Sequence, residues 1–409
     1  MSSMQRWKRT FAAVWLANTI TAIGMMAFLP FFASQLRALG LEDRDEIATW
    51  AGVLYGAAPL TAALASPFWG VLGDRFGRRV MVLRSLLAIT VFVGAMAFAT
   101  SPWQLLALRI AQGVFSGFVA PSITLVSVLA PPHMQSRTSG WLNTSMVVGA
   151  ILGPVFGELL RAQLDIQAVY LAVSILAAVA AVLVFAFAYE DPTQRRTSIG
   201  PGRSGWRGLV KATFGDLGLL RSNRSLRASV MLLFWLQFGL GATNPLLELH
   251  VADLSSHFDW LTPSTSALFF SMSAANLIAM PLWGRYGDRR GAYAALKHCA
   301  VACGCALLLQ AFASSFETLL VARVAFGAAM AGSAPLAFGV AAAESSAEQR
   351  GGAIGVVFGA RAFAIAVASM LGGVLSAWLG VRGLFLVAGL VLFTYLAVLR
   401  RAPTSASAT

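Results

Sequence analysis

Long apolar segments constrain this chain more than any other feature of its sequence. A helix needs about 20 predominantly apolar residues to cross about 30 Å of hydrocarbon. Because the runs are continuously apolar rather than alternating, helices are favoured over a membrane β-barrel. The sequence predicts an all-α membrane protein with twelve transmembrane helices. The predicted spans are 11–36, 49–72, 81–100, 102–129, 137–162, 165–189, 227–252, 262–284, 294–313, 316–342, 351–378 and 381–400.

Composition and charge also indicate a membrane protein. Of the 409 residues, 58% are hydrophobic and only 11% are charged, whereas soluble domains average about 25% charged residues. The net charge of +13 comes from short segments between the spans, so a role in membrane topology is favoured over nucleic-acid binding. With the N terminus inside, 23 of the 30 Lys and Arg residues lie inside and four outside. The positive-inside rule therefore predicts two cytoplasmic termini.

The sequence contains an internal repeat. Residues 70–83 read GVLGDRFGRRVMVL, and residues 284–297 read GRYGDRRGAYAALK. A constant offset of 214 residues links Pro67 to Pro281, Trp69 to Trp283, Gly73 to Gly287, Asp74 to Asp288, Arg109 to Arg323, Gly113 to Gly327 and Pro121 to Pro335. Parallel repeats of this kind, with a substrate held near the midplane, are typical of rocking transporters.

The repeat predicts two pseudo-symmetric six-helix bundles, residues 1–189 and 227–409, joined by a cytoplasmic linker over 190–226. The start of the linker is rich in Pro, Gly, Ser and Arg, as is usual for such segments. Its second half has the pattern of a short amphipathic helix on the inner membrane surface. A single chain supplies both halves of a cavity, so we expect a monomer.

The repeated segment is a candidate cytoplasmic gate. Glycine permits a tight turn and close backbone approach, and an acid at the membrane edge can accept from a helix N terminus or an arginine. An acid contributes little to topology, so we interpret Asp74 as functional, whereas topology alone can equally explain Arg78 and Arg79. The predicted gate residues are Gly70, Gly73, Asp74, Arg75, Gly77, Arg78 and Arg79, with Gly287, Asp288 and Arg289 in the second copy.

Three motifs resemble those of the major facilitator superfamily. ASPFWGVLGDRFGRRVMVLRS is similar to its cytoplasmic signature, LALRIAQGVFSG to its second signature, and VVGAILGPVFGELL to the third, which is characteristic of the drug:proton antiporter group. The first half most resembles bacterial MdtG-type multidrug efflux proteins. In the third motif Glu158 departs from the pattern, since it stands where the family usually has a second Gly.

The resemblance implies a fold, an energy source and residue roles. The fold would be that of a twelve-span transporter in a bacterial inner membrane, with a small-molecule substrate, protons as the energy source and no cofactor. Asp74 would form part of an inside latch against the eleventh span. Arg109 would be tied to proton coupling or to that latch.

Ionisable residues within spans are functional candidates, because each is costly without a partner. The bases are Arg109, Arg323 and Arg361. Arg361 can face an anionic substrate, pair with a carboxylate across the cavity, or serve a structural pairing. Glu158 and Glu248 can carry a proton if burial raises their pKa, or can be outer rim residues in water.

Small and polar residues mark two further candidate features. Gly149, Gly153 and Gly157 form a stripe that allows close helix packing, and Pro154 bends the same helix; this antiporter-motif helix can limit leak at the interface of the halves or merely pack. Met and aromatic residues suit adaptable recognition. The candidate substrate-cavity residues are Asn18, Met25, Met26, Phe28, Asn143, Gln237, Asn244 and Asn276.

The leading hypothesis is proton-coupled efflux of drugs or amphiphilic small molecules by alternating access. Three intramembrane arginines and few acids favour an alternative, an exporter or importer of an anionic metabolite or siderophore. A non-transporting membrane receptor or scaffold is the alternative of another class. An enzyme is not expected, because no H-E-x-x-H or G-x-S-x-G motif is present. Cys299, Cys303 and Cys305 have only His298 nearby, so we predict helix packing rather than a metal site.

Overall fold

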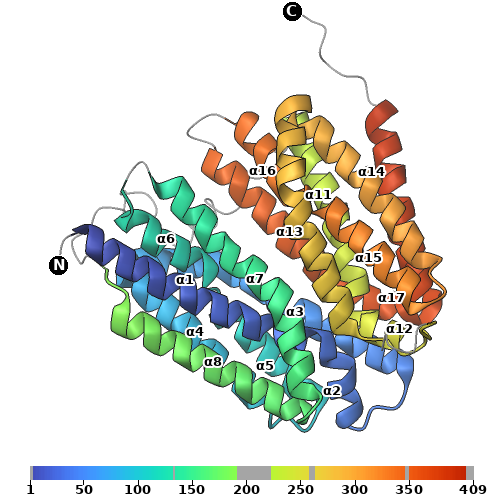
Figure 1. The fold of residues 1–409 in the computed structure, drawn as a ribbon, viewed down its shortest axis with the longest axis horizontal. Coiled ribbons are helices and arrows are strands. Elements are labelled where there is room, and N and C mark those ends of the chain that lie inside the picture. Colours follow the sequence, from blue (N-terminus) through green and yellow to red (C-terminus); the bar gives the residue numbers. More distant parts are fainter. Residues whose placement is uncertain (1–2, 132–133, 191–222, 258–262, 346–349, 402–409) are drawn as a thin grey trace, which may run out of the picture. The chain divides into compact units, whose positions relative to one another are not determined.

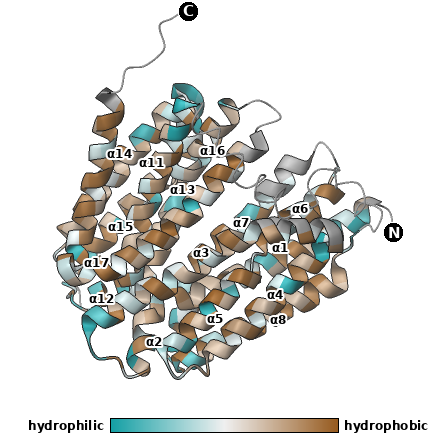
Figure 2. Ribbon diagram, turned by 180° about the vertical axis from the view of Figure 1, so that it is seen from behind, coloured by the Kyte–Doolittle hydropathy of each residue, from teal (hydrophilic) through white to brown (hydrophobic). Residues whose placement is uncertain are grey.

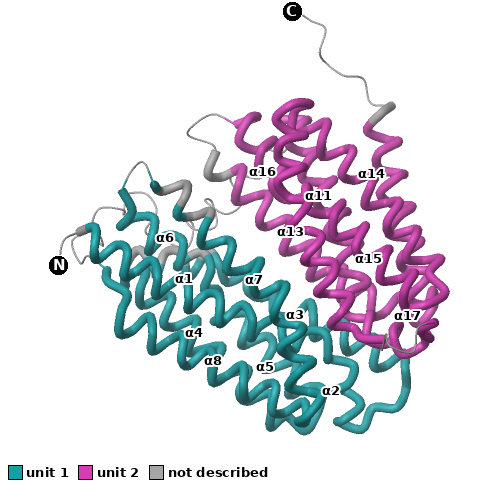
Figure 3. Tube along the Cα trace, in the orientation of Figure 1, with its two compact units in different colours: residues 1–213 teal, residues 214–409 magenta. Residues whose placement is uncertain are grey.

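The computed structural model describes residues 3–131, 134–190, 223–257, 263–345 and 350–401 (Figure 1). Every regular element in these ranges is helical, which confirms the all-α fold. The chain divides into two compact units, residues 1–213 and 214–409 (Figure 3). The predicted amphipathic helix of the linker lies outside the described residues.

The N-terminal unit consists of helices whose order follows the predicted spans. They are α1 (Ser3–Phe28), η1 (Leu29–Phe31), α2 (Phe32–Ala38), α3 (Arg44–Phe76), α4 (Arg78–Met96), α5 (Pro102–Phe115), α6 (Val119–Leu129), α7 (Gln135–Arg161) and α8 (Ile166–Phe187). Helix α1 packs along α7 and α8, and α3 packs along α5.

The C-terminal unit repeats this arrangement. Its elements are α11 (Arg224–Thr243), η4 (Asn244–Leu246), α12 (Leu247–Val251), α13 (Thr265–Arg290), α14 (Ala292–Ala311), α15 (Phe316–Met330), α16 (Ser333–Ala343) and α17 (Arg350–Arg401). Helix α11 packs along α17, and α13 packs along α15, so the pairs of the first unit recur in the second.

Ten helices of the described chain are long and apolar enough to cross a membrane, and two local features account for the difference from twelve predicted spans. The fourth span is split, because α5 ends at Phe115 and α6 begins at Val119. The last two spans are continuous in α17, whose 52 residues are too long for one crossing at about 1.5 Å per residue. Gly380, with φ 64° and ψ 170°, breaks α17 between them.

Proline explains the matching irregularities near the ends of the first and seventh spans. Pro30 lies in η1 and Pro245 in η4, each a short 3-10 helix between two α-helices. Proline lacks the backbone N–H that an α-helix interior requires. The repeat seen in the sequence therefore produces the same break in both units.

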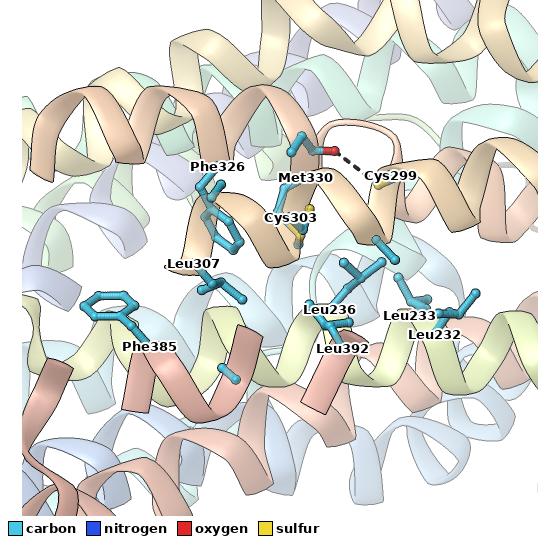
Figure 4. Close-up of a cluster of buried hydrophobic side chains, with 14 of the residues drawn as sticks. Leu232, Leu233, Leu236, Cys299, Cys303, Leu307, Phe326, Met330, Phe385 and Leu392 are labelled. Carbon is cyan, nitrogen blue, oxygen red and sulfur yellow. Dashed lines mark hydrogen bonds between the residues drawn. The ribbon is translucent and has the colours of Figure 1, made fainter. Parts of the chain in front are cut away.

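Apolar side chains fill the interior of each unit and also cover its outside. In the C-terminal unit Leu236, Cys303, Leu307 and Phe326 belong to one buried cluster (Figure 4). Hydrophobic residues also lie along the helix surfaces (Figure 2), and Trp378 is 86% exposed. A large apolar surface of this kind is expected where lipid rather than water surrounds the helices.

Candidate functional site

The N-terminal unit holds a fully buried arginine. Helix α5 begins after Ser101, whose side chain accepts from the Gln104 N–H, and it carries Arg109 two turns later. Arg109 is 2% exposed. Its Nε donates to the Leu54 carbonyl of α3 at 2.9 Å, and its Nη1 donates to Gln112 Oε1 at 2.6 Å. Neutral oxygens thus replace the water that the charge loses.

Aromatic rings and one further side chain complete the Arg109 cluster. The guanidinium carbon lies 5.6 Å from the ring centre of Phe28 and 5.3 Å from that of Phe32, within the range of a cation–π contact. Gln112 Nε2 donates to Met25 Sδ at 3.2 Å. The cluster therefore links α1, α2, α3 and α5, and its bonds can respond when any of these helices moves.

Arg323 is the corresponding buried charge of the C-terminal unit. It is 0% exposed and lies in α15, which begins at a capping box formed by Ser315 and Thr318. Its Nη2 donates to Asn244 Oδ1 at 2.9 Å, and its Nη1 donates to Gln310 Oε1 at 3.3 Å. Arg323 therefore ties α15 to η4 and to α14.

Arg361 differs from the two buried arginines. It lies in α17 and is partly exposed, and it makes no hydrogen bond or ion pair with any residue that the structure describes. A cation without an anionic partner inside a span is costly. Arg361 is therefore available to an anionic group other than those of the described residues.

The charged segment of the N-terminal unit is mostly helical. Helix α3 continues to Phe76, and only Gly77, with φ 102°, leaves the helix before α4 begins. The expected turn is thus one residue long, and Gly70, Gly73, Asp74 and Arg75 belong to α3. The side chains of Asp74 and Arg75 lie outside the described residues.

Glu190 holds the start of α4, a role that the sequence analysis missed. Its carboxylate accepts the backbone N–H groups of Arg78 at 2.6 Å and Arg79 at 3.2 Å, where the partial positive charge of a helix N terminus favours an anion. The Arg79 side chain donates to the Phe185 carbonyl of α8 and lies over the Phe185 ring. Arg79 is thus tied to α8 within the N-terminal unit.

The second copy of the charged segment has the same single-glycine turn. Helix α13 ends at Arg290, and Gly291, with φ 83°, precedes α14. Asp288 and Arg289 are exposed and bond to none of the described residues. Gly287 is buried, and a side chain there would crowd Leu336.

The glycine stripe of α7 faces α1 of its own unit. A Cβ at Gly149 or Gly157 would overlap the backbone of Ala22 or Ala27, and a Cβ at Gly153 would lie 2.5 Å from Met26 Cβ. Pro154 is buried inside α7. The stripe therefore permits the close approach of α1 and α7.

The two candidate proton carriers differ in their surroundings. Glu158 is partly exposed near the end of α7 and makes no side-chain bond with a described residue. Glu248 lies in the short helix α12 and has an interaction partner. Nearby His250 is 4% exposed and lies against the Phe385 ring, with 6.1 Å between ring centres.

The candidate cavity residues of the N-terminal unit do not share one environment. Asn18 is 1% exposed and accepts from the Ser122 hydroxyl of α6 at 3.0 Å. Phe28 is fully buried against Arg109 and Tyr170. Met25 and Met26 are partly exposed, and Asn143 is exposed.

The candidates of the C-terminal unit are more buried. Gln237 is 1% exposed, and its Oε1 accepts no hydrogen bond from the described chain. Asn244 accepts from Arg323, and Asn276 Nδ2 donates to the Gly327 carbonyl at 3.2 Å. Gln112 and Gln310, the amides that hold the buried arginines, were absent from the predicted residues, although Gln112 follows Arg109 by less than one turn.

Comparison with known proteins shows the family. Residues 14–263 and 237–409 match the model of the Major Facilitator Superfamily. The multidrug resistance protein MdtG of Dickeya zeae (strain Ech586) is 28% identical over 381 residues, which cover 93% of this chain and 91% of the relative. The staphyloferrin B transporter of Staphylococcus aureus (strain NCTC 8325 / PS 47) is 29% identical over 331 residues, which cover 80% of this chain and 77% of the relative.

A solved structure supports the same fold. The human organic anion transporter TETRAN is 20% identical, with a TM-score of 0.70 over 96% of this chain and 99% of that one. At that identity the likeness concerns the fold alone. Because the family match extends over most of the sequence, the chain belongs to the Major Facilitator Superfamily, and it is a multi-pass secondary transporter rather than an enzyme.

Proposed function

We propose that this transporter exports drugs or other amphiphilic small molecules in exchange for protons. The observation that carries the proposal is the similarity to MdtG, which extends over 93% of the chain and includes the antiporter-motif helix α7. In the proposed cycle the substrate binds from the inside, and proton entry from outside resets the protein. Both termini are cytoplasmic in this proposal.

The buried Arg109 cluster suits a coupling role. An arginine stays charged at working pH, so Arg109 supplies a fixed positive field rather than a transferred proton. Its neutral partners in α3 and α5 leave that charge uncompensated by an acid there. A field of this kind favours the ionised form of a carboxylate, so proton release from an acid such as Glu158 would depend on helix positions.

The gate role of the charged segment remains part of the proposal. Glu190 and the Gly77 turn hold α4 against the end of α3 and α8. Asp74 belongs to the last turn of α3, directly before this glycine turn. Asp74 is therefore the residue whose substitution should impair closure of the inner side.

Proton-driven transport in inverted membrane vesicles tests the proposal. Vesicles with an imposed inside-acid gradient and a fluorescent pH reporter receive cationic, neutral or anionic compounds in turn. We expect some compounds to collapse the gradient with wild-type protein, and Asp74→Asn, Arg109→Gln and Glu158→Gln to reduce the response. Lys8→Gln, an exposed charge at the start of α1, serves as the matched control. No response to any compound class, with folded protein shown in the vesicles, would rule out drug:proton antiport.

Arg361 favours a second candidate function, transport of an anionic metabolite or siderophore. Its guanidinium has no partner among the described residues, and a relative at 29% identity is a staphyloferrin B transporter. Counterflow of radiolabelled anionic and cationic substrates separates the two functions. Loss of anion transport alone in Arg361→Gln would support this candidate, whereas unchanged anion transport would exclude Arg361 from recognition.

A further inference from the structure

A groove opens on the surface of the C-terminal unit between α13, α14 and α15. Its volume is about 780 Å³, within the range of about 300–1,000 Å³ typical of small-molecule sites. Half of its twelve lining residues are alanines, while Leu282, Cys305 and Leu309 are exposed at its walls. On α13 the lining runs from Ala279 to Tyr286, about 10 Å of helix at 1.5 Å per residue.

Polar groups gather at one end of this groove. The Tyr286 hydroxyl and His298 Nδ1 lie 3.0 Å apart. The Trp283 indole N–H already donates to the Ala328 carbonyl at 2.9 Å, so the indole presents its apolar ring. The groove is therefore apolar along its length and polar at the end near the α13–α14 turn.

At the repeated position of the N-terminal unit, aromatic residues stand in place of two of these alanines. Ala306 and Ala329 correspond to Phe92 and Phe115, 214 residues earlier. The Phe115 ring lies 5.9 Å from that of Phe92 and 5.6 Å from that of Trp69. Aromatic rings therefore stand in the first unit where alanines leave space in the second.

One hydrogen bond near this position recurs in both units. Trp69 donates to the Val114 carbonyl as Trp283 does to Ala328. Arg84, the counterpart of His298, lies over the Trp69 ring at 3.6 Å and covers it. Ala306, Ala329 and His298 of the groove lining are thus specific to the second repeat.

Positive charge continues the groove beyond its polar end. Arg289 and Arg290 follow Tyr286 by three and four residues, which places them one turn further on the same face of α13. Both are exposed, and neither bonds to a residue in the described ranges. Asp288 is the acid of this turn and is exposed as well, while Arg285 keeps the turn positive overall.

We propose that this groove binds one anionic phospholipid of the surrounding bilayer. The acyl chain occupies the alanine floor, and the phosphate accepts from Arg289, Arg290 and the Tyr286–His298 pair. Guanidinium groups match phosphate geometry through paired donors, and basic pockets between transmembrane helices suit anionic head groups. The groove would hold a lipid on the arginine-bearing side, which is the inner leaflet under the proposed topology.

Native mass spectrometry of the detergent-solubilised protein tests this site. Phosphatidylglycerol or phosphatidylcholine is added, and the lipids retained per protein are counted. We expect phosphatidylglycerol to be retained several-fold more than phosphatidylcholine. Arg289→Gln with Arg290→Gln should abolish the preference, and Ala306→Phe, which copies the N-terminal unit, should abolish retention. The double variant Lys8→Gln with Arg37→Gln has the same charge change on exposed residues elsewhere and should behave as wild type.

Chemical modification of Cys305 tests whether the lipid binds in this groove. It is exposed, whereas Cys299 and Cys303 are buried, so a bulky maleimide should modify Cys305 and fill the groove. Modification should reduce phosphatidylglycerol retention, and Cys305→Ala treated with the same reagent should retain it.

Three results would overturn the proposal. The first is equal retention of the two lipids, and the second is retention unaffected by both the arginine and the maleimide changes. The third is protection of Cys305 from maleimide only at high protein concentration. That result would show that a second copy of the chain, rather than a lipid, covers the groove. Arg289 and Arg290 lie on the surface, so their variants should fold. They test the proposal even if Ala306→Phe fails to fold.

Discussion

Arg109 and Arg323 occupy the same position of the repeat and are equally buried, yet different partners hold them. Arg109 depends on a backbone carbonyl of α3 and on a glutamine of its own helix. Arg323 depends on two amide side chains from η4 and α14. Both repeats thus keep the buried arginine, but each unit supplies its own hydrogen-bond acceptors. A substitution of an acceptor in one unit therefore has no matching substitution in the other.

The largest expected effect is on the stability of the Arg323 cluster. Asn244→Leu combined with Gln310→Leu removes both amide acceptors, whereas Gln112→Leu leaves Arg109 its Leu54 carbonyl. Hydrogen bonds to charged groups contribute about 1.5–3 kcal/mol each, so the double variant should lose at least about 3 kcal/mol and Gln112→Leu about half of that. Thermal unfolding in detergent measures both. Adding Arg323→Met to the double variant should restore part of the loss, because a buried charge that has lost two hydrogen bonds is then removed. Equal losses in the two units would contradict the comparison.

Substitutions of Arg109 and Arg323 should also differ in their effect on transport, by a smaller free energy than in stability. Arg109 reaches α1 through Gln112 and Met25, and α1 packs on the glycine stripe of the antiporter-motif helix α7, whereas Arg323 reaches the C-terminal end of α11 through Asn244. We expect Arg109→Gln to lower drug-driven proton flux at least tenfold, about 1.4 kcal/mol, and Arg323→Gln to lower it less. The vesicle assay measures the initial rates at matched protein levels. A larger loss in Arg323→Gln would reverse the assignment of coupling to the N-terminal unit.

The two glycine turns allow a further comparison. Glu190 accepts two N–H groups at the start of α4, and no side chain caps the start of α14 in the described structure. Glu190→Ala should therefore cost about 1 kcal/mol of stability, in the range of other lost N-terminal caps. High salt should shrink the difference from wild type, because part of it is electrostatic. Glu42→Ala, an exposed acid that bonds to none of the described residues, is the control and should change stability less.

The smallest expected effect concerns the caps of the two arginine-bearing helices. Ser315 forms a reciprocal capping box with Thr318, whereas Ser101 accepts one N–H at 3.4 Å. Both Ser→Ala changes should fall within about 0.5–2 kcal/mol, with Ser315→Ala nearer the upper end. Thermal unfolding of the two variants side by side gives the ranking, and a larger loss for Ser101→Ala would show that the box adds nothing.

The repeat made much of this comparison predictable from the sequence. The 214-residue offset paired Arg109 with Arg323, and the spacing of apolar segments predicted the spans. Helix ends were harder to predict, since helix α3 continues through Gly70 and Gly73 and ends only before Gly77. A glycine within a helix is tolerated when packing compensates, and sequence spacing does not report that packing.

The partners of the site residues could not be read in the same way. Glu190 lies more than 100 residues from the N–H groups that it caps, and Asn244 lies 79 residues from Arg323. Such pairs depend on which helix faces meet, and residues at offset 214 need not keep the same neighbours. The groove shows the same limit, because the alanines that line it read as ordinary packing residues.

The single-residue turns at Gly77 and Gly291 also have a mechanical consequence. In the α3–α4 and α13–α14 pairs, one glycine joins two long helices, so no flexible loop separates the end of one helix from the start of the next. A displacement at the end of α3 therefore reaches α4 through a single residue, Gly77. Inserting glycines after Gly77 would lengthen the turn and let α3 and α4 move independently. A movement of one helix would then no longer displace the other.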